Sequence, residues 1–229
     1  MKTGRAGQAF WWLVRTVVLA ACRVAFRVRV VGRGRVPADG AYILAPSHRS
    51  ILDVPFTVFT TRRRICFLAK QELFRSRLGG ALFPPLGGIR VERGSTDRAA
   101  LRAADAVLLA GEPLAIFPEG TRRRGPALGD LFHGAAYLAL KRRVPIVPVG
   151  IGGSEEILPS GHAVPRPHRV VVVVGPPLAP APAATARRRG DVAALTERLR
   201  VALQDAFDEA RRRAGTAGAL RAGEVREGA

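Results

Sequence analysis

Short runs of continuously apolar residues constrain the fold of this chain most strongly. Two of them, VPIVPVG (144–150) and RVVVVVG (169–175), do not alternate apolar with polar residues. A strand reads this way when both of its faces are buried, as in a parallel sheet that helices cover on both sides. The same signal predicts seven strands, at 27–31, 41–45, 64–69, 88–91, 113–117, 144–150 and 169–175.

Helical patterns lie between most of these strands, at about 52–60, 95–110, 131–142 and 191–213. Alternation of strands and helices predicts an α/β fold with a largely parallel central sheet flanked by helices. A chain of 229 residues suits one core rather than two. We therefore expect an N-terminal helix over 1–26, one domain over 27–213 and a disordered tail over 214–229.

The net charge of the chain limits the classes of molecule that it is expected to bind. The chain has 37 Lys and Arg against 18 Asp and Glu, which gives a net charge of +19 and a pI of about 11.7. Such a balance favours nucleic acid, an anionic membrane or phosphorylated molecules as partners. Cys22 and Cys66 are the only cysteines. They predict neither a disulfide framework nor a metal site, and they fit a reducing cytosolic setting.

The N-terminal segment FWWLVRTVVLAACRVAFRV is apolar but is interrupted by Arg15, Arg23 and Arg27. Its charge-free pieces are shorter than the roughly 20 residues of a simple transmembrane helix. On a helix, the three arginines fall within one arc, and tryptophans at 11 and 12 suit the headgroup boundary. This pattern predicts a helix in the membrane interface with its arginines facing anionic headgroups. The alternative is a helix packed on the protein's own core.

Polar residues interrupt the apolar sequence at SHRSILDVP (47–55), directly after the predicted strand 41–45. His48 precedes Asp53 with four residues between them, an HX4D pattern. The pair is either a structural hydrogen bond or a general base held by a carboxylate. In an α/β fold, the ends of strands are where functional residues collect.

A second polar stretch, AIFPEGTRRRG (115–125), follows another predicted strand. Gly120 permits a tight turn close to a ligand, and the turn presents Glu119, Thr121 and Arg122 together. The carboxylate can accept hydrogen bonds from substrate hydroxyls, whereas the hydroxyl, the arginine and the turn amides suit a phosphate. A surface turn with a run of charges is the alternative.

Together, SHRSILD and FPEGTR resemble the signature pair of the glycerolipid acyltransferases, the family of the 1-acylglycerol-3-phosphate acyltransferases. The family's first motif usually begins with Asn, where this chain has Ser47. GGIRVERG (87–94) is similar to the second motif, with Arg93 at its basic position, although Arg90 stands where an aromatic residue or Pro is more usual. AKQELF (69–74), with Lys70, is similar to the family's Lys-containing stretch, and VPIVPVGI (144–151) to its fourth motif.

The resemblance, which runs from about Val30 to Pro177, implies a glycerol-3-phosphate acyltransferase-like fold and an acyltransferase domain over 27–213. It implies that His48 deprotonates the acceptor hydroxyl while Asp53 holds the imidazole. The substrate-binding residues it implies are Lys70, Arg93, Glu119, Gly120, Thr121 and Arg122. No cofactor is implied, because acyl-CoA or acyl carrier protein is a co-substrate.

The implied reaction acylates 1-acyl-sn-glycerol-3-phosphate, or lysophosphatidic acid, to give phosphatidic acid in phospholipid biosynthesis. The N-terminal segment predicts monotopic or peripheral attachment to anionic lipids, and the site is expected on the cytoplasmic face of the cell membrane, where acyl donors are made.

Two alternatives remain at this stage, and a third is disfavoured. The motifs describe the reaction better than the acceptor, so a lyso-ornithine lipid, another lysophospholipid or a glycolipid could take the acyl group. A nucleic-acid-binding protein is suggested by charge alone, but the basic runs lack interleaved aromatic residues and any recognised motif. A serine hydrolase using Ser47 or Ser50 is disfavoured, because it would need a nucleophile elbow and the chain has no GxSxG.

Overall fold

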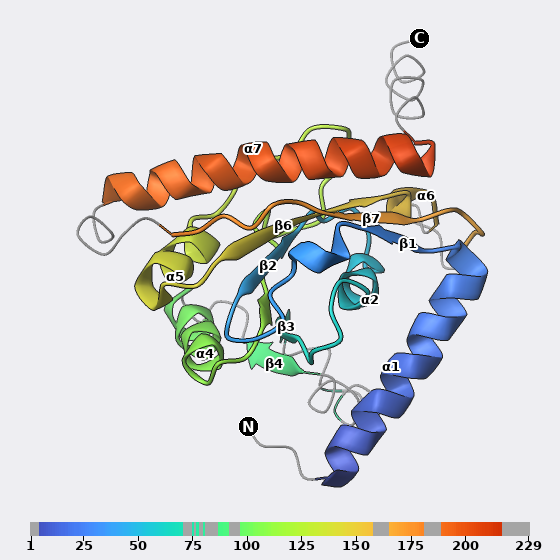
Figure 1. The fold of residues 1–229 in the computed structure, drawn as a ribbon, viewed down its shortest axis with the longest axis horizontal. Coiled ribbons are helices and arrows are strands. Elements are labelled where there is room, and N and C mark those ends of the chain that lie inside the picture. The colour runs from blue at the N-terminus through green and yellow to red at the C-terminus, as the bar shows by residue number, and fades with distance from the viewer. Residues whose placement is uncertain are drawn as a thin grey trace.

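The structure, a computed structural model, describes residues 5–70, 87–91, 97–157, 165–180 and 189–216, together with residues 75, 77 and 80. Seven strands in these ranges form one sheet in the order β1-β7-β6-β2-β5-β3-β4 (Figure 1). Their bounds are β1 Arg29–Val31, β2 Ile43–Pro46, β3 Cys66–Lys70, β4 Gly88–Val91, β5 Leu114–Ala115, β6 Ile146–Gly152 and β7 Val171–Val174.

Every neighbouring pair of strands is parallel except β6 and β7. The predicted α/β fold with a largely parallel sheet is therefore confirmed, and each of the seven predicted strands is present. The strands β6, β2, β5, β3 and β4 run the same way, so their carboxyl ends lie along one edge of the sheet. β7 and β1 run in the opposite direction.

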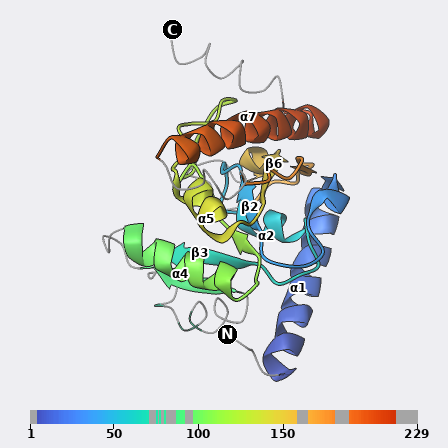
Figure 2. The same cartoon turned by 60° about the vertical axis from the view of Figure 1, so that its left-hand side comes forward.

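Helices cover both faces of this sheet (Figures 1 and 2). The helices are α1 Arg5–Phe26, α2 Asp53–Val58, α4 Asp97–Leu109, α5 Gly134–Arg142, α6 Ser154–Ile157 and α7 Arg189–Ala214, with a 3₁₀ turn η1 at Arg33–Arg35. Leu44 packs with residues of α1 and α2, and its neighbour Ile43 packs with residues of α4, α5 and α7. Both are fully buried, which explains why β2 reads as continuously apolar.

The helix α7 lies directly on β6 because glycines remove the side chains that would separate them. A Cβ atom on Gly150 would stand 2.1 Å from the carbonyl oxygen of Ala206 in α7, well inside the contact distance of two atoms. The VGIG sequence of β6 therefore sets the spacing of this layer.

The orientation of α1 differs from the prediction. Arg15 does not face outward: its guanidinium donates to the carbonyl of Thr61 at 2.8 Å and lies over the ring of Trp11. Trp11, Leu19 and Cys22 are buried on the same side. The helix thus packs on the domain through the side that carries Arg15, because the Thr61 carbonyl accepts its hydrogen bond and Leu19 and Cys22 join the core there.

The opposite side of α1 is apolar and exposed. Leu13 is 62%, Val17 is 59% and Val24 is 84% exposed. The stretch Ala9–Phe26 has a mean hydropathy of 1.6, so α1 is long and apolar enough to cross a membrane by length and composition alone. An apolar face of this size, left uncovered by the domain, favours association with a membrane.

Candidate active site

The loop between β2 and α2 places His48 next to Asp53. The imidazole Nδ1 lies 3.2 Å from Oδ2 of Asp53, which is the first residue of α2 and fully buried. The same oxygen accepts hydrogen bonds from the backbone N–H groups of Arg49 at 2.6 Å and Ser50 at 2.7 Å. One carboxylate therefore shapes the turn and also orients the imidazole, so the structural hydrogen bond predicted from the HX4D pattern is present.

This contact defines what the imidazole of His48 can do. An ionised carboxylate only accepts hydrogen bonds, so Nδ1 carries a proton and donates it; in the neutral imidazole this leaves a lone pair on Nε2. The ring of Phe117 stacks against the imidazole with a centroid distance of 4.2 Å. The His48 side chain is 17% exposed, so a hydroxyl group brought to the surface can reach this base.

A buried ion pair joins the two polar motifs. Nη1 of Arg49 lies 2.9 Å from both carboxylate oxygens of Glu119, and the Arg49 side chain is 1% exposed while that of Glu119 is 0% exposed. Arg49 also donates to the carbonyls of Gly125 and Ala127, and its guanidinium lies 4.6 Å from the ring centroid of Phe207 on α7. Such a pair is stable in the interior because its remaining donors are satisfied.

The expected role of Glu119 is corrected by this geometry. Its carboxylate also accepts from the backbone N–H groups of His48 at 3.0 Å and Gly129 at 3.3 Å. With its oxygens engaged and no exposed surface, it does not face a substrate hydroxyl. Glu119 instead holds the backbone of His48 in place.

The carbonyl of His48 is held as firmly as its amide. It accepts from the backbone N–H of Arg123 at 2.9 Å and from Nη1 of Arg49 at 3.0 Å. The loop after β5 therefore positions the loop after β2. The sequence interpretation missed Arg49, although a charged residue in an apolar run and an opposite charge in the second motif were available as signals.

Gly120, Thr121 and Arg122 lie on the same loop, next to the contact with His48. Gly120 has φ +68°, and a Cβ there would stand 2.5 Å from the ring of Phe132, so the turn requires glycine. Thr121 and Arg122 are exposed. In the described part of the chain, Arg122 has no ion-pair partner and remains available to an anion.

Two other predicted residues are placed only in part. The backbone of Lys70 ends β3, where it pairs with Val91 at the end of β4, and its side chain lies outside the described residues. Arg93 also lies outside them. Since β3 and β4 run parallel with β2 and β5, the motif segments at the ends of these four strands lie at the same edge of the sheet.

The serines beside His48 have structural partners. Oγ of Ser47 accepts from the backbone N–H of Ile151 in β6 at 3.0 Å, and Oγ of Ser50 accepts from that of Leu52 at 3.3 Å. Nδ1 of His133, at the start of α5, lies 3.0 Å from Oγ1 of Thr196 on α7. None of these three side chains is arranged as a nucleophile with a base.

Glu155, in α6, lies near enough to Asp53 for the two carboxylates to interact. Burial raises the pKa of Glu155, and the negative charge of Asp53 adds to this shift, while Arg211 opposes it.

Within the described ranges, no three His, Cys, Asp or Glu side chains gather as a metal site requires.

Comparisons with known proteins identify the family of this chain. The family profile described as Acyltransferase matches residues 27–152. A 1-acyl-sn-glycerol-3-phosphate acyltransferase of Bacillus subtilis is 28% identical over 173 residues, which cover 75% of this chain and 84% of the relative. One from Chlamydomonas reinhardtii is 30% identical over 160 residues, 68% of this chain, and the match spans 48% of that longer protein.

A solved structure has the same fold. The crystal structure of the 1-acyl-sn-glycerophosphate acyltransferase PlsC from Thermotoga maritima superposes with a TM-score of 0.72 at 23% identity, covering 89% of this chain and 81% of that one. The profile match spans more than half of the chain and includes both polar motifs. The chain therefore belongs to the acyltransferase family, and the protein is an acyltransferase.

Proposed function

We propose that this enzyme transfers a fatty acyl group from a thioester to the free hydroxyl of 1-acyl-sn-glycerol-3-phosphate, giving phosphatidic acid. The observation that carries the proposal is the His48 imidazole, held through Nδ1 by the buried Asp53 with Nε2 left free. The names of the relatives support the acceptor. The donor is acyl-CoA or acyl carrier protein.

Nε2 of His48 takes the proton from the acceptor hydroxyl as its oxygen attacks the thioester carbonyl. A new C–O ester bond forms, the C–S bond breaks, and the thiolate leaves and takes up the proton. Asp53 stabilises the imidazolium that exists between these two transfers, and it maintains the tautomer that makes Nε2 the base. The substrate supplies the nucleophile, so no acyl-enzyme is needed.

Substitution of the pair tests the base. His48→Ala and Asp53→Asn should each lower kcat by roughly 10²–10⁴, the second because an amide can stabilise the wrong tautomer. His133→Ala is the matched control, since that histidine contacts Thr196 on α7 and should leave kcat nearly unchanged. A folded His48→Ala enzyme with wild-type kcat would refute the mechanism.

Direct transfer makes a second test possible. Ser47 and Ser50 are engaged by backbone amides, and burial raises the pKa of the Cys66 thiol, which disfavours its thiolate. Rapid quench with radiolabelled acyl-CoA and no acceptor should leave the denatured protein unlabelled. A stoichiometric adduct would show that an acyl-enzyme forms.

The acceptor phosphate is proposed to bind four side chains, those of Arg122, Thr121, Arg93 and Lys70. A guanidinium and a hydroxyl suit a phosphate monoester, and the loop that carries Arg122 is bonded to His48 through Arg123. Charge-assisted bonds of this kind contribute about 1.5–3 kcal/mol each, which is roughly ten- to a hundredfold in affinity.

The acceptor test compares substrates. Arg122→Ala should lower kcat/KM for lysophosphatidic acid about ten- to a hundredfold and for a zwitterionic lyso-ornithine lipid much less. Arg124→Ala, an exposed neighbour on the same loop, is the matched control. A wild-type enzyme that prefers the zwitterionic lipid would show that the acceptor is not lysophosphatidic acid.

Attachment through α1 on the cytoplasmic face is the location proposed for this reaction, because acyl donors are made in the cytoplasm. The helix contacts the domain through Leu19 and Cys22, which join the core, and through Arg15, which donates to the Thr61 carbonyl. A spanning helix would leave the domain, so this packing favours a helix lying in the interface.

Adding negative charge to the exposed face of α1 tests whether this face inserts into the membrane interface. Leu13→Glu with Val17→Glu should release the protein from liposomes in a flotation assay, because both side chains are exposed on the apolar face. Leu109→Glu with Val201→Glu adds the same charge at exposed apolar positions of α4 and α7 and should change flotation little. Equal release by both pairs would exclude insertion of this face.

A further inference from the structure

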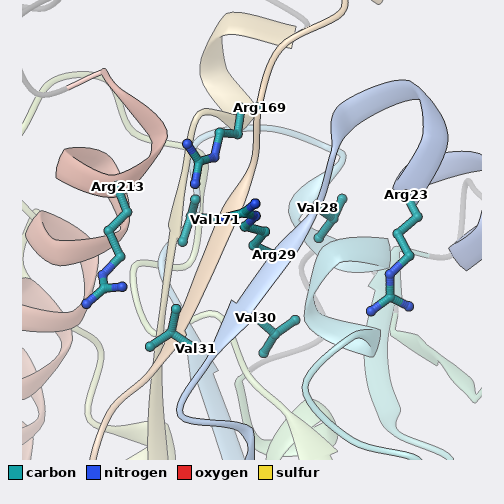
Figure 3. A pocket seen from close by; sticks show the side chains of 8 residues that line it. All are labelled: Arg23, Val28, Arg29, Val30, Val31, Arg169, Val171 and Arg213. Carbon is teal, nitrogen blue, oxygen red and sulfur yellow. The ribbon is translucent and has the colours of Figure 1, made fainter.

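A cavity at the β1 edge of the sheet is lined by arginines and valines. Its volume is about 550 Å³, and it lies where the end of α1, the strand β1, the segment entering β7 and the last turn of α7 meet (Figures 1 and 3). The lining residues are Arg23, Val28, Arg29, Val30, Val31, Arg169, Val171 and Arg213. In the sheet, β7 and β6 lie between β1 and β2, so this cavity is separate from the His48 loop.

The pairing of β1 with β7 brings two of the arginines together. Arg29 stands opposite Val171 in the parallel register, and Arg169 comes two residues before Val171, so both side chains lie on the same face. Figure 3 shows Arg169 and Arg29 between α7 and β1, with the Arg213 side chain of α7 directed away from them and Arg23 on the α1 side of β1.

Positive charge in this cavity is poorly compensated. No acidic residue lines it, and within the described ranges Arg23, Arg29 and Arg169 form no ion pair. Arg213 does pair with Glu209, but Arg212 shares that carboxylate. Guanidinium groups are well matched in shape to phosphate oxygens. A bound phosphate group would supply the negative charge that the lining lacks.

The surroundings of the cavity identify the source of the phosphate. Arg23 adjoins Val24, which is 84% exposed and continues the apolar face of α1. Four valines provide the rest of the wall. A ligand that places a phosphate against arginines and an acyl chain along an exposed apolar helix is a phospholipid lying in a bilayer.

We propose that this cavity binds the phosphate of an anionic phospholipid headgroup and thereby orients the domain on the membrane. The proposal rests on the membrane attachment of α1 but not on the acyl-transfer chemistry. A free phosphate ion shares the chemistry of the headgroup, so the experiment must separate the two.

The test measures binding of the full chain to vesicles. Arg29→Gln with Arg169→Gln should weaken binding to vesicles of phosphatidylglycerol and phosphatidylcholine by roughly fivefold for each arginine, more than tenfold together, with little effect on pure phosphatidylcholine. Arg98→Gln with Arg102→Gln removes the same charge from exposed positions of α4, the helix that contacts β3, β4 and β5. This control should retain wild-type binding.

Equal weakening in the two variants would overturn the proposal, because diffuse attraction between a basic protein and an anionic surface predicts that result. A wild-type protein that binds both vesicle types equally would also overturn it, and this measurement does not depend on the folding of any variant. Inorganic phosphate competes as the free ion. If inorganic phosphate binds the wild type but not Arg29→Gln with Arg169→Gln, while both proteins bind the anionic vesicles equally, the cavity binds free phosphate and the lipid assignment is wrong.

The readout also separates this proposal from the catalytic one. Vesicle binding is measured without acyl donor, so His48→Ala should bind vesicles as the wild type does even though its turnover is lost. Loss of binding in Arg29→Gln with Arg169→Gln, at an unchanged melting temperature, therefore concerns the cavity alone.

Discussion

Replacing Arg49 with methionine tests whether the ion pair between the two motifs holds the candidate site together. The variant leaves the Glu119 carboxylate fully buried without its guanidinium partner, and it removes donors from the carbonyls of His48 and Ala127. Breaking a buried pair by removing one partner costs about 3–5 kcal/mol. In a chain of 229 residues, each kcal/mol lowers the melting temperature by roughly 2–4 °C. The expected drop is about 6–20 °C.

The Arg49→Met variant should also transfer acyl groups more slowly, for a reason separate from its lower stability. The backbone amide of His48 donates to Glu119, and its carbonyl accepts from Arg49, so loss of the pair lets the imidazole move. A displacement of about 1 Å can cost roughly 10²-fold in rate. Acyl transfer should be assayed well below the new melting temperature, so that slower turnover is not confused with unfolding.

Two further variants serve as controls for the loss of the buried ion pair. Arg200→Met removes an arginine from the exposed pair with Glu197 and should leave the melting temperature nearly unchanged. Arg49→Met with Glu119→Leu removes both charges, so it should recover part of the stability without recovering turnover, because the amide of His48 lacks its acceptor. A melting temperature for Arg49→Met equal to that for Arg200→Met would refute the reasoning.

Two other features give separate predictions. Gly150→Ala should lower the melting temperature by several degrees in a thermal scan, because the new Cβ would meet the carbonyl of Ala206 at 2.1 Å and force α7 away from β6. Hydrogen bonds from Arg142 and Lys141 lower the pKa of Asp105 from 3.8 to about 2, so its stabilising effect is present above about pH 4 and is lost as the pH falls toward 2. The difference in melting temperature between wild type and Asp105→Asn should therefore narrow over that range, and a constant difference would contradict the assignment.

The sequence by itself determined the elements, because hydrophobic runs and helical periodicity are local properties. The strand predicted at 88–91 has those bounds in the structure, and the helix predicted at 95–110 is found at Asp97–Leu109. The HX4D pattern likewise anticipated the contact between His48 and Asp53, since a turn of six residues can close on itself. The direction of a strand could not be predicted in the same way. Nothing in the sequence RVVVVVG indicates that β7 runs antiparallel to β6.

Only the tertiary structure decided which distant groups meet. Arg15 could face lipid or protein by periodicity alone, and it faces the domain because the Thr61 carbonyl, 46 residues away, accepts its hydrogen bond. Glu119 looked like a substrate ligand because its loop presents polar residues. It is buried because Arg49, 70 residues earlier, reaches it across the edge of the sheet. Local patterns indicate which residues are polar at a strand end, whereas partners far apart in sequence determine whether such a residue faces the substrate or supports the site from behind.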